Sequence, residues 1–319
     1  MPSMHVQADH GVRRVGVSGS HNARHHGAMT AREPMPRPVL RADEIRSLLL
    51  APTGPLARVE IVDVTESTNS DVAAQLRADP AAWPDASVLI AEHQVAGRGR
   101  AGRSWETPAG SALTCSFVVR PQIPASSLGW LGLLAGLGAV NALRATAGVP
   151  AVLKWPNDLL VPADTEVEDW GPVRKIGGIL AEVVPMSDGG PSAIVIGIGI
   201  NVSQTEDELP VPSATSLALA GAQHVDREGM LVALVDAQLE VARRWRESGG
   251  DAVGSGLADE VARVCSTIGD EVRVELPGGG ELTGVAERLA GDGGLVVRDL
   301  DGAEHHVLAG DVRHVRTAR

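Results

Sequence analysis

The chain has 319 residues, 44% of them hydrophobic, and its 40 acidic and 28 basic side chains give a formal net charge of −12. This length and apolar content exclude an intrinsically disordered protein and predict about two folded domains. The net negative charge argues against nucleic acid or an anionic membrane as a partner, because both bind proteins mainly through contacts between basic side chains and phosphate groups.

The expected elements follow one another in a mixed pattern of helices and strands. Residues 1–40 are rich in histidine and arginine and have no apolar core typical of a signal peptide, so we expect a disordered tail. The next elements are a helix over 42–50, a strand over 59–64, a helix that is capped by Ser67-Thr68-Asn69 and runs to Arg77, and a strand over 87–91. A basic loop over 92–105 leads to a strand over 112–119, a helix over 128–146, strands over 151–154, 175–184 and 193–201, and a helix over 230–248.

The composition changes near Ile268. Short alternating strands are expected over 271–276, 281–288, 294–299 and 304–308, and glycine-rich turns join them. Four or five short strands with tight turns predict a small barrel or sandwich. We therefore divide the chain into a tail (1–40), a ligand-binding domain (41–265) and a small β domain (266–319).

Cysteine usage and hydropathy limit the compartment. Cys115 and Cys265 match no metal-ligand spacing, which argues against structural zinc and against a disulfide framework. Reduced thiols are typical of a cytoplasmic protein. The longest apolar stretch, 128–143, is too short and too internal to span a membrane, so we expect a buried helix there.

The first candidate site is the basic loop, which places three glycines and three arginines between Gly97 and Trp105. It lacks the order of a P-loop and is too rich in arginine for a dinucleotide fingerprint. A solvated loop with biased codons would also explain glycine and arginine. Its position directly after a buried strand, with Trp105 at its end, favours a loop that closes over an anionic ligand.

The second candidate is Lys154-Trp155-Pro156-Asn157-Asp158, which predicts a turn at a strand end. The third is a pair of apolar strands, Lys175-Ile-Gly-Gly-Ile-Leu-Ala-Glu182 and Ile196-Gly-Ile-Gly-Ile-Asn201, whose glycines would leave a slot for a flat, mostly apolar ligand. The alternative is packing relief, in which such glycines only make room for neighbouring side chains of the protein and bind no ligand.

Lysine usage connects the last two candidates. The only lysines of the chain are Lys154 and Lys175, and both lie inside these motifs. An ammonium group is a compact charge that contacts a carboxylate and a phosphate oxygen together, whereas a guanidinium group prefers planar, bidentate partners. A reaction that joins a carboxylate to a nucleotide phosphate brings two anions together, and lysines here, with the arginines of the loop, would offset their repulsion.

Taken together, the motifs resemble those of biotin protein ligases, the biotin–[acetyl-CoA-carboxylase] ligases. The resemblance rests on Ser67-Thr68-Asn69, Gln94, the Gly97–Trp105 loop, Lys154–Asp158, Lys175–Leu180 and Gly197–Asn201, and it covers residues 57–316 in order. It implies an α+β fold with a catalytic domain like that of class II aminoacyl-tRNA synthetases, which binds biotin and ATP, and a C-terminal SH3-like β-barrel.

The resemblance also implies an activity. Biotin and ATP, with Mg²⁺, would form biotinyl-5′-AMP, and the biotinyl group would then pass to a lysine of a biotin carboxyl carrier domain. Carried over by motif, the catalytic residues would be Arg100, Lys175 and Asp158, with Asp158 facing the incoming amine. The biotin-binding residues would be Ser67, Thr68, Asn69, Gln94, Arg98, Gly99, Arg100 and Lys175. The ATP-binding residues would be Arg103, Trp105, Lys154, Asn157 and Asn201, with no protein cage for a metal ion.

Two features depart from the family pattern. Residues before Arg41 show no helix-turn-helix, so we expect a ligase without a repressor function. The polar, acid-rich stretch between Leu160 and Arg174 resembles an extended hairpin turn. Within it, an insertion over 161–173 separates two site motifs and is expected to loop out. The alternatives are a lipoyl or octanoyl ligase of the same superfamily, which should lack the basic loop, a non-catalytic biotin-sensing repressor, and an inactive scaffold, against which both lysines argue.

Overall fold

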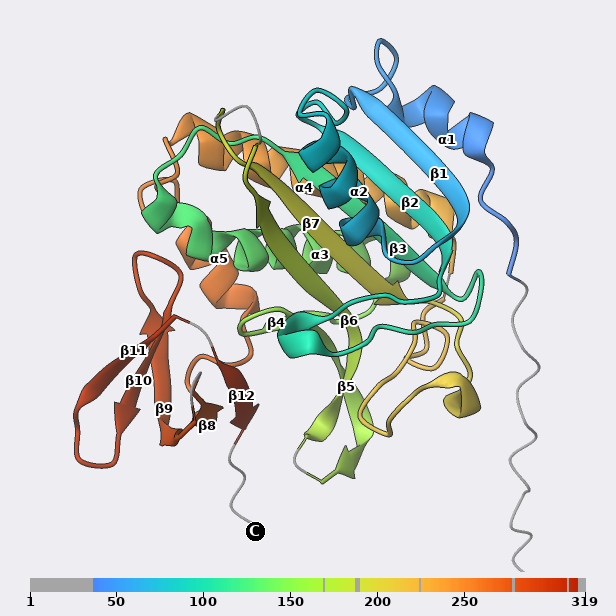
Figure 1. Cartoon of the computed structure of the whole chain (residues 1–319). Helices are drawn as coiled ribbons and strands as arrows, with labels where there is room; N and C mark the ends of the chain where they lie inside the picture. The colour runs from blue at the N-terminus through green and yellow to red at the C-terminus, as the bar shows by residue number, and fades with distance from the viewer. Residues whose placement is uncertain are drawn as a thin grey trace, which may run out of the picture. The chain divides into compact units, whose positions relative to one another are not determined.

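The computed structural model describes residues 37–168, 170–186, 190–223, 225–276, 279–308 and 310–314, and within them a seven-stranded sheet forms the larger domain (Figure 1). Its strands are β1 (Arg58–Thr65), β2 (Ser87–Gln94), β3 (Ala112–Val119), β4 (Val152–Lys154), β5 (Asp158–Val167), β6 (Gly171–Val184) and β7 (Ala193–Asn201). They are ordered β1-β2-β3-β7-β6-β5-β4. Strands β1 and β2 are parallel, and the other neighbours are antiparallel.

Helices cover both faces of this sheet. Helix α2 (Thr68–Ala78) packs on one face, and α3 (Leu131–Ala147) and α4 (Arg227–Glu247) pack on the other. Neighbouring residues of a strand therefore enter different cores: Phe117 faces α3, whereas Val118 faces α2. Burial on both faces explains why the central strands are almost continuously apolar.

The expected helices are present with small differences at their ends. Helix α1 spans Ala42–Leu49, and Ser67 caps α2, as predicted. A 3₁₀ turn (η2, Ala125–Trp130) precedes α3, so the regular helix begins three residues later than expected. Helix α4 begins at Arg227 because the Asp226 side chain accepts a hydrogen bond from the Glu228 amide and caps it.

Helix α3 is the buried core helix that its apolar sequence predicts. Together with η2 it is long and apolar enough to cross a membrane by length and composition, but two thirds of that window are buried inside the protein. It contacts α4 and the sheet, and it ends at Gly148, whose φ of +66° lies in the left-handed region.

The C-terminal domain is a five-stranded antiparallel sheet in the described residues, in the order β11-β10-β9-β8-β12. Its strands are β8 (Glu271–Glu275), β9 (Glu281–Leu289), β10 (Leu295–Asp299), β11 (Glu304–Val307) and β12 (Asp311–His314). The sequence predicted the first four. The domain boundary expected at 265/266 lies between helix α5 (Leu257–Val264), which the sequence analysis missed, and β8.

Two tryptophans join this small sheet to the larger domain. The Trp130 indole donates to the Gly291 carbonyl at 2.8 Å, and the Trp155 indole donates to the Gly293 carbonyl at 3.2 Å. The Trp155 amide also donates to the Thr267 hydroxyl. Trp155 is therefore a buried structural anchor, although it also borders the cleft.

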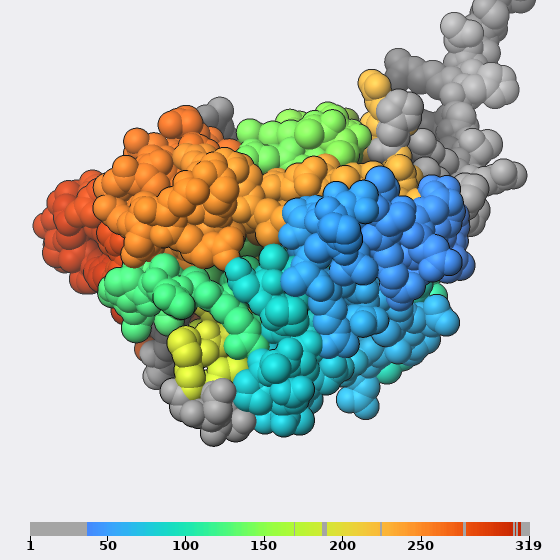
Figure 2. Space-filling model, turned by 90° about the horizontal axis from the view of Figure 1, so that it is seen from above, coloured from blue at the N-terminus to red at the C-terminus, as the bar shows by residue number. Residues whose placement is uncertain are grey.

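The expected tail is too long at its C-terminal end. Residues 1–36 lie outside the described residues, but Leu40 is buried in the main core, and its amide donates to the Glu92 carboxylate. The Glu92 carboxylate pairs with buried Arg227 at 2.8 Å. Figure 2 shows the blue N-terminal segment against the orange surface of α4. Arg41 of this segment forms an ion pair with Glu228 of α4. An apolar anchor and buried charges thus order the segment from Arg37 onward.

This anchor gives a prediction for acid stability. The Arg37 guanidinium, which bonds the Glu208 carboxylate, lowers the pKa of Glu208 from 4.5 to about 2. A carboxylate with a lowered folded-state pKa stabilises the protein above its unfolded pKa and loses this effect as pH falls toward the folded value. We expect Arg37→Ala to lower the free energy of unfolding at pH 7 by about 1 kcal/mol after solvent screening, and by less at pH 2.5. Urea unfolding at both pH values, with exposed Arg243→Ala as control, measures this; an equal loss at both would contradict it.

Candidate functional site

The residues singled out from the sequence meet in one cleft of about 400 Å³. Those that line it are Ser67, Thr68, Asn69, Gln94, Arg98, Gly99, Arg100, Arg103, Trp105, Lys154, Asn157, Asp158 and Lys175. They come from the start of α2, the end of β2, the basic loop, the β4–β5 turn and β6. Of the expected set, only Asn201 lies elsewhere.

Glycines of β6 and β7 form the floor of the cleft. Gly178 and Gly199 are paired in register, so two positions without a side chain lie next to each other. A Cβ atom at Gly199 would lie 2.7 Å from the Trp105 ring, and one at Gly197 would collide with the Asn69 amide. The glycines therefore let an aromatic ring and a polar side chain of the protein itself approach the strand backbone closely, as the packing-relief alternative expects. The slot for a flat ligand stays a prediction.

A polar network closes one end of the cleft. The Gln94 carbonyl oxygen accepts hydrogen bonds from the amide and the hydroxyl of Thr68 at 2.8 and 3.0 Å. The Ser116 hydroxyl lies 2.7 Å from the Thr68 hydroxyl and 2.6 Å from the Asn69 carbonyl oxygen. The Asn69 amide donates to the Leu180 carbonyl and to Glu182. These buried donors and acceptors fix one another in place, which suits recognition of a small polar head group.

The two lysines lie in the same cleft, on strands β4 and β6, which β5 separates. The Lys175 ammonium is 2.5 Å from the Asp158 carboxylate, and both side chains are partly shielded from water. Lys154 is paired in register with Asp158, and its ammonium lies 4.6 Å from the centroid of the Trp170 ring. The cleft therefore joins its neutral polar end to a cationic region.

The basic loop is connected to both sides of the cleft. An Arg100 guanidinium nitrogen donates to the Asn157 side-chain oxygen at 3.2 Å, and Arg98 forms an ion pair with Glu182 at 3.0 Å. The Trp105 amide donates to the Gly97 carbonyl, which closes the loop at its base. The Trp105 indole nitrogen is buried and has no hydrogen-bond partner among the described residues. An unsatisfied indole N–H in a ligand cleft is a donor that a ligand can engage.

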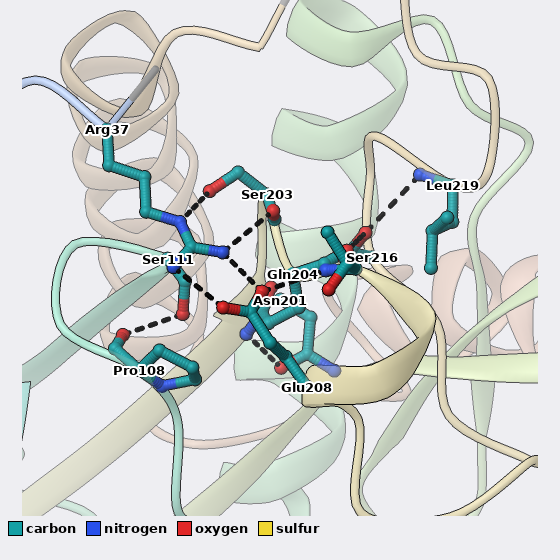
Figure 3. A network of polar contacts seen from close by, with 10 residues as sticks. Arg37, Pro108, Ser111, Asn201, Ser203, Gln204, Glu208, Ser216 and Leu219 are labelled. Atoms are coloured by element: carbon teal, nitrogen blue, oxygen red, sulfur yellow. Dashed lines mark hydrogen bonds and ion pairs between the residues drawn. The ribbon is translucent and has the colours of Figure 1, made fainter. Parts of the chain in front are cut away.

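Asn201 was expected among the ATP-binding residues but does not line the cleft. At the end of β7 its amide nitrogen donates to the Thr215 carbonyl at 2.9 Å, and its oxygen accepts from Gln204 at 3.0 Å (Figure 3). The same network contains Ser203 and Glu208, which Arg37 contacts. Both polar atoms of Asn201 thus hold the loop after β7, and the structure does not support its expected contact with the nucleotide.

Several residues of the cleft were missed. Trp170 stands on the insertion, which forms the end of the β5–β6 hairpin in agreement with the expected hairpin turn. Its contact with the wall of the cleft was not expected. Glu275, Val312 and Arg313 come from the C-terminal domain. Cys115 also lines the cleft, and burial raises the pKa of its thiol to about 12, so it is a neutral lining group at physiological pH. Glu182, which ends the Lys175 motif, does not line the cleft but contacts Asn69 and Arg98, which do.

The comparisons with known proteins agree with this arrangement. Residues 61–201 match the biotin/lipoate A/B protein ligase family, and residues 267–315 match the biotin protein ligase C-terminal domain. The biotin–[acetyl-CoA-carboxylase] ligase of Mycobacterium tuberculosis is 37% identical over 90% of this chain and 100% of that protein.

Two solved structures are similar over most of the chain. The Aquifex aeolicus biotin protein ligase in complex with biotin and ATP has a TM-score of 0.59 at 25% identity, over 82% of this chain and 99% of that one. The Leishmania major biotin protein ligase in complex with biotinyl-5-AMP has a TM-score of 0.51 at 25% identity, over 79% of this chain and 99% of that one. With its glycine-floored cleft, the two lysines that line it and its C-terminal sheet, the chain belongs to the biotin protein ligase family.

Proposed function

We propose that this protein activates biotin with MgATP to biotinyl-5′-AMP and pyrophosphate, and then transfers the biotinyl group to a lysine of a biotin carboxyl carrier domain. The observation that carries the proposal is the succession of surfaces in one cleft. A polar end at Thr68, Asn69 and Gln94 is followed by a glycine floor and then by the Lys154 and Lys175 ammonium groups. This order fits an acid with a polar head, an apolar body and a carboxylate that meets a nucleotide.

The first step requires charge stabilisation rather than a base, because a carboxylate is already ionised at neutral pH. Two anions held at about 4 Å repel each other by about 4 kcal/mol at an effective dielectric constant near 20. Lys175 lies where its ammonium offsets this repulsion, and the loop arginines add further positive charge. The biotin carboxylate attacks the α-phosphorus, an acyl phosphate bond forms, and pyrophosphate leaves.

Magnesium enters the proposal with ATP. Residues 37–314, apart from the gaps in their description, contain no group of three histidine, cysteine, aspartate or glutamate side chains that would hold a metal ion. Mg²⁺ usually keeps several waters and binds substrate phosphates with few protein carboxylates, so this donor set suits an ion carried by the nucleotide. The use of cellular ATP and the two free, buried thiols fit a cytoplasmic enzyme.

In the second step the acceptor amine attacks the carbonyl carbon, an amide bond forms, the bond to the phosphate oxygen breaks and AMP leaves. The amine must lose a proton, and Asp158 is the carboxylate beside Lys175 that receives or orients it in this proposal.

We expect Asp158→Asn to slow transfer from preformed biotinyl-AMP by about 100-fold, because an amide cannot accept the proton. Adenylation should fall by less than about tenfold, since the amide oxygen still accepts from Lys175. Single-turnover transfer to a carrier domain measures the first effect, and pyrophosphate exchange measures the second. Full transfer by Asp158→Asn would remove Asp158 from the mechanism.

The main competing function is ligation of lipoate or octanoate, which the broader family name includes. The basic loop and the matched C-terminal domain favour biotin. The test incubates purified protein and MgATP with biotin, lipoate or octanoate in separate reactions. It measures the pyrophosphate that each of the three substrates releases and the mass of a carrier domain after the reaction. Release with biotin alone supports the proposal, whereas a preference for lipoate or octanoate, or no release with any acid, rejects it. No feature of the described residues supports a repressor function. Residues 1–36, where a DNA-binding segment was not expected, lie outside the described residues.

A further inference from the structure

The β5–β6 hairpin carries Trp170 to the wall of the cleft and holds it there. Val167 and Gly171 pair across the end of the hairpin, and the Trp170 amide donates to the Val167 carbonyl at 3.0 Å. Arg174 is 8% exposed, and its guanidinium donates to the carbonyls of Gly171 and Thr165 at 3.1 and 2.9 Å. A buried guanidinium therefore braces the segment on which Trp170 stands.

Trp170 makes its contact with Lys154. The half-buried indole ring lies with its centroid 4.6 Å from the Lys154 ammonium, and both residues line the cleft. A cation over the face of tryptophan is attracted by the ring, and tryptophan is the aromatic residue that binds cations best. A lysine side chain can populate many rotamers, and a rigid aromatic neighbour is one of the contacts that restrict where its charge lies.

The described side chains of the hairpin differ in where they lie. Asp164 and Glu166 are exposed on β5, whereas Trp170 lines the cleft. Lys154 is paired in register with Asp158, so the ring holds an ammonium beside the Asp158–Lys175 pair. The hairpin thus acts on the cationic region of the site and not on its polar end.

We propose that Trp170 is a positioning residue that holds the Lys154 ammonium for the phosphates of MgATP, so that this hairpin sets the affinity of the enzyme for the nucleotide. The inference rests on the proposed function and goes beyond it, because it assigns a function to the insertion between the two lysine motifs. A charge that is already in place binds phosphate without the loss of rotamer freedom that a mobile lysine would incur.

The test compares Trp170→Ala, Trp170→Phe, Lys154→Ala and the Trp170→Ala/Lys154→Ala pair, with Glu166→Gln on the same hairpin as a matched control. MgATP binding is measured by calorimetry, and biotin-dependent pyrophosphate exchange gives KM for ATP, KM for biotin and kcat. We expect Trp170→Ala to raise the Kd and KM for ATP by about five- to thirtyfold, with kcat and KM for biotin within twofold. Phenylalanine should restore most of the affinity, and Glu166→Gln should change nothing.

The double variant decides whether Trp170 acts through Lys154. In the Lys154→Ala background, Trp170→Ala should have no further effect on ATP affinity. Independent, additive effects would overturn the proposal, and so would an unchanged ATP affinity or an equal loss of biotin affinity in Trp170→Ala. If the wild-type protein binds MgATP but shows no exchange, the proposed function fails while calorimetry still decides the role of Trp170. If it binds no MgATP, both fail.

Discussion

Replacement of Lys175 by alanine is expected to lower the rate of biotin-dependent pyrophosphate exchange by about 100- to 1,000-fold, while the protein stays folded. In the proposed mechanism Lys175, which an ion pair with Asp158 holds in the cleft, is a preorganised charge beside the two reacting anions, and removal of one such group from a site costs about this much. The loss should appear mainly in kcat, because the charge that develops on the phosphate is greatest in the transition state.

Lys175→Arg is the informative companion. It keeps the positive charge but replaces a compact ammonium by a planar fork, in a chain that otherwise uses arginine almost throughout. We expect it to recover only part of the rate, and full recovery would mean that charge alone matters. Exchange by Lys175→Ala within about threefold of wild type would contradict the assigned role. Thermal unfolding of each variant separates these results from a loss of structure.

Arg100→Ala is expected to release biotinyl-AMP into solution. The Arg100 guanidinium connects the basic loop to Asn157 on the opposite side of the cleft. Charge-assisted hydrogen bonds contribute about 1.5–3 kcal/mol, so loss of this contact should increase the escape of the intermediate by about 10- to 100-fold. A closed loop also keeps water from a reactive mixed anhydride, so hydrolysis should rise as well.

Rapid filtration after incubation with biotin and MgATP measures the free adenylate directly. Arg243→Ala, on the exposed surface of α4, is the matched control for loss of an arginine and should retain the intermediate as the wild type does. Equal retention by Arg100→Ala would contradict the view that the basic loop closes over the adenylate.

The sequence predicted those parts of the site that local chemistry determines. Glycine pairs in apolar strands, a Pro-Asn-Asp turn and a Ser-Thr-Asn cap each have a physical reason to occur where they do, and all of them border the cleft. The buried strands and α3 were also predictable, because such long apolar runs are stable only when they are buried in a core.

What the sequence did not predict depends on distant contacts. Asn201 shares the β7 motif with Gly197 and Gly199, but Thr215 and Gln204 return to it and engage both of its polar atoms. Helix α5 was missed for another reason. It has eight residues, as the predicted α1 has, and the helical spacing of its apolar Leu257, Val261 and Val264 went unrecognised in so short a segment. Trp170 reaches the cleft only because β5 and β6 pair along the acid-rich insertion. No local pattern reports such returns of the chain.

The most direct test of the account follows one turnover on the purified protein. With biotin and MgATP but no acceptor, we expect the protein to release one pyrophosphate per active site and to keep the biotinyl-AMP bound. Addition of a carrier domain should then convert the bound adenylate to AMP and increase the carrier mass by one biotinyl group on a single lysine. No biotin-dependent pyrophosphate, or an adenylate that a carrier domain does not consume, would contradict the account.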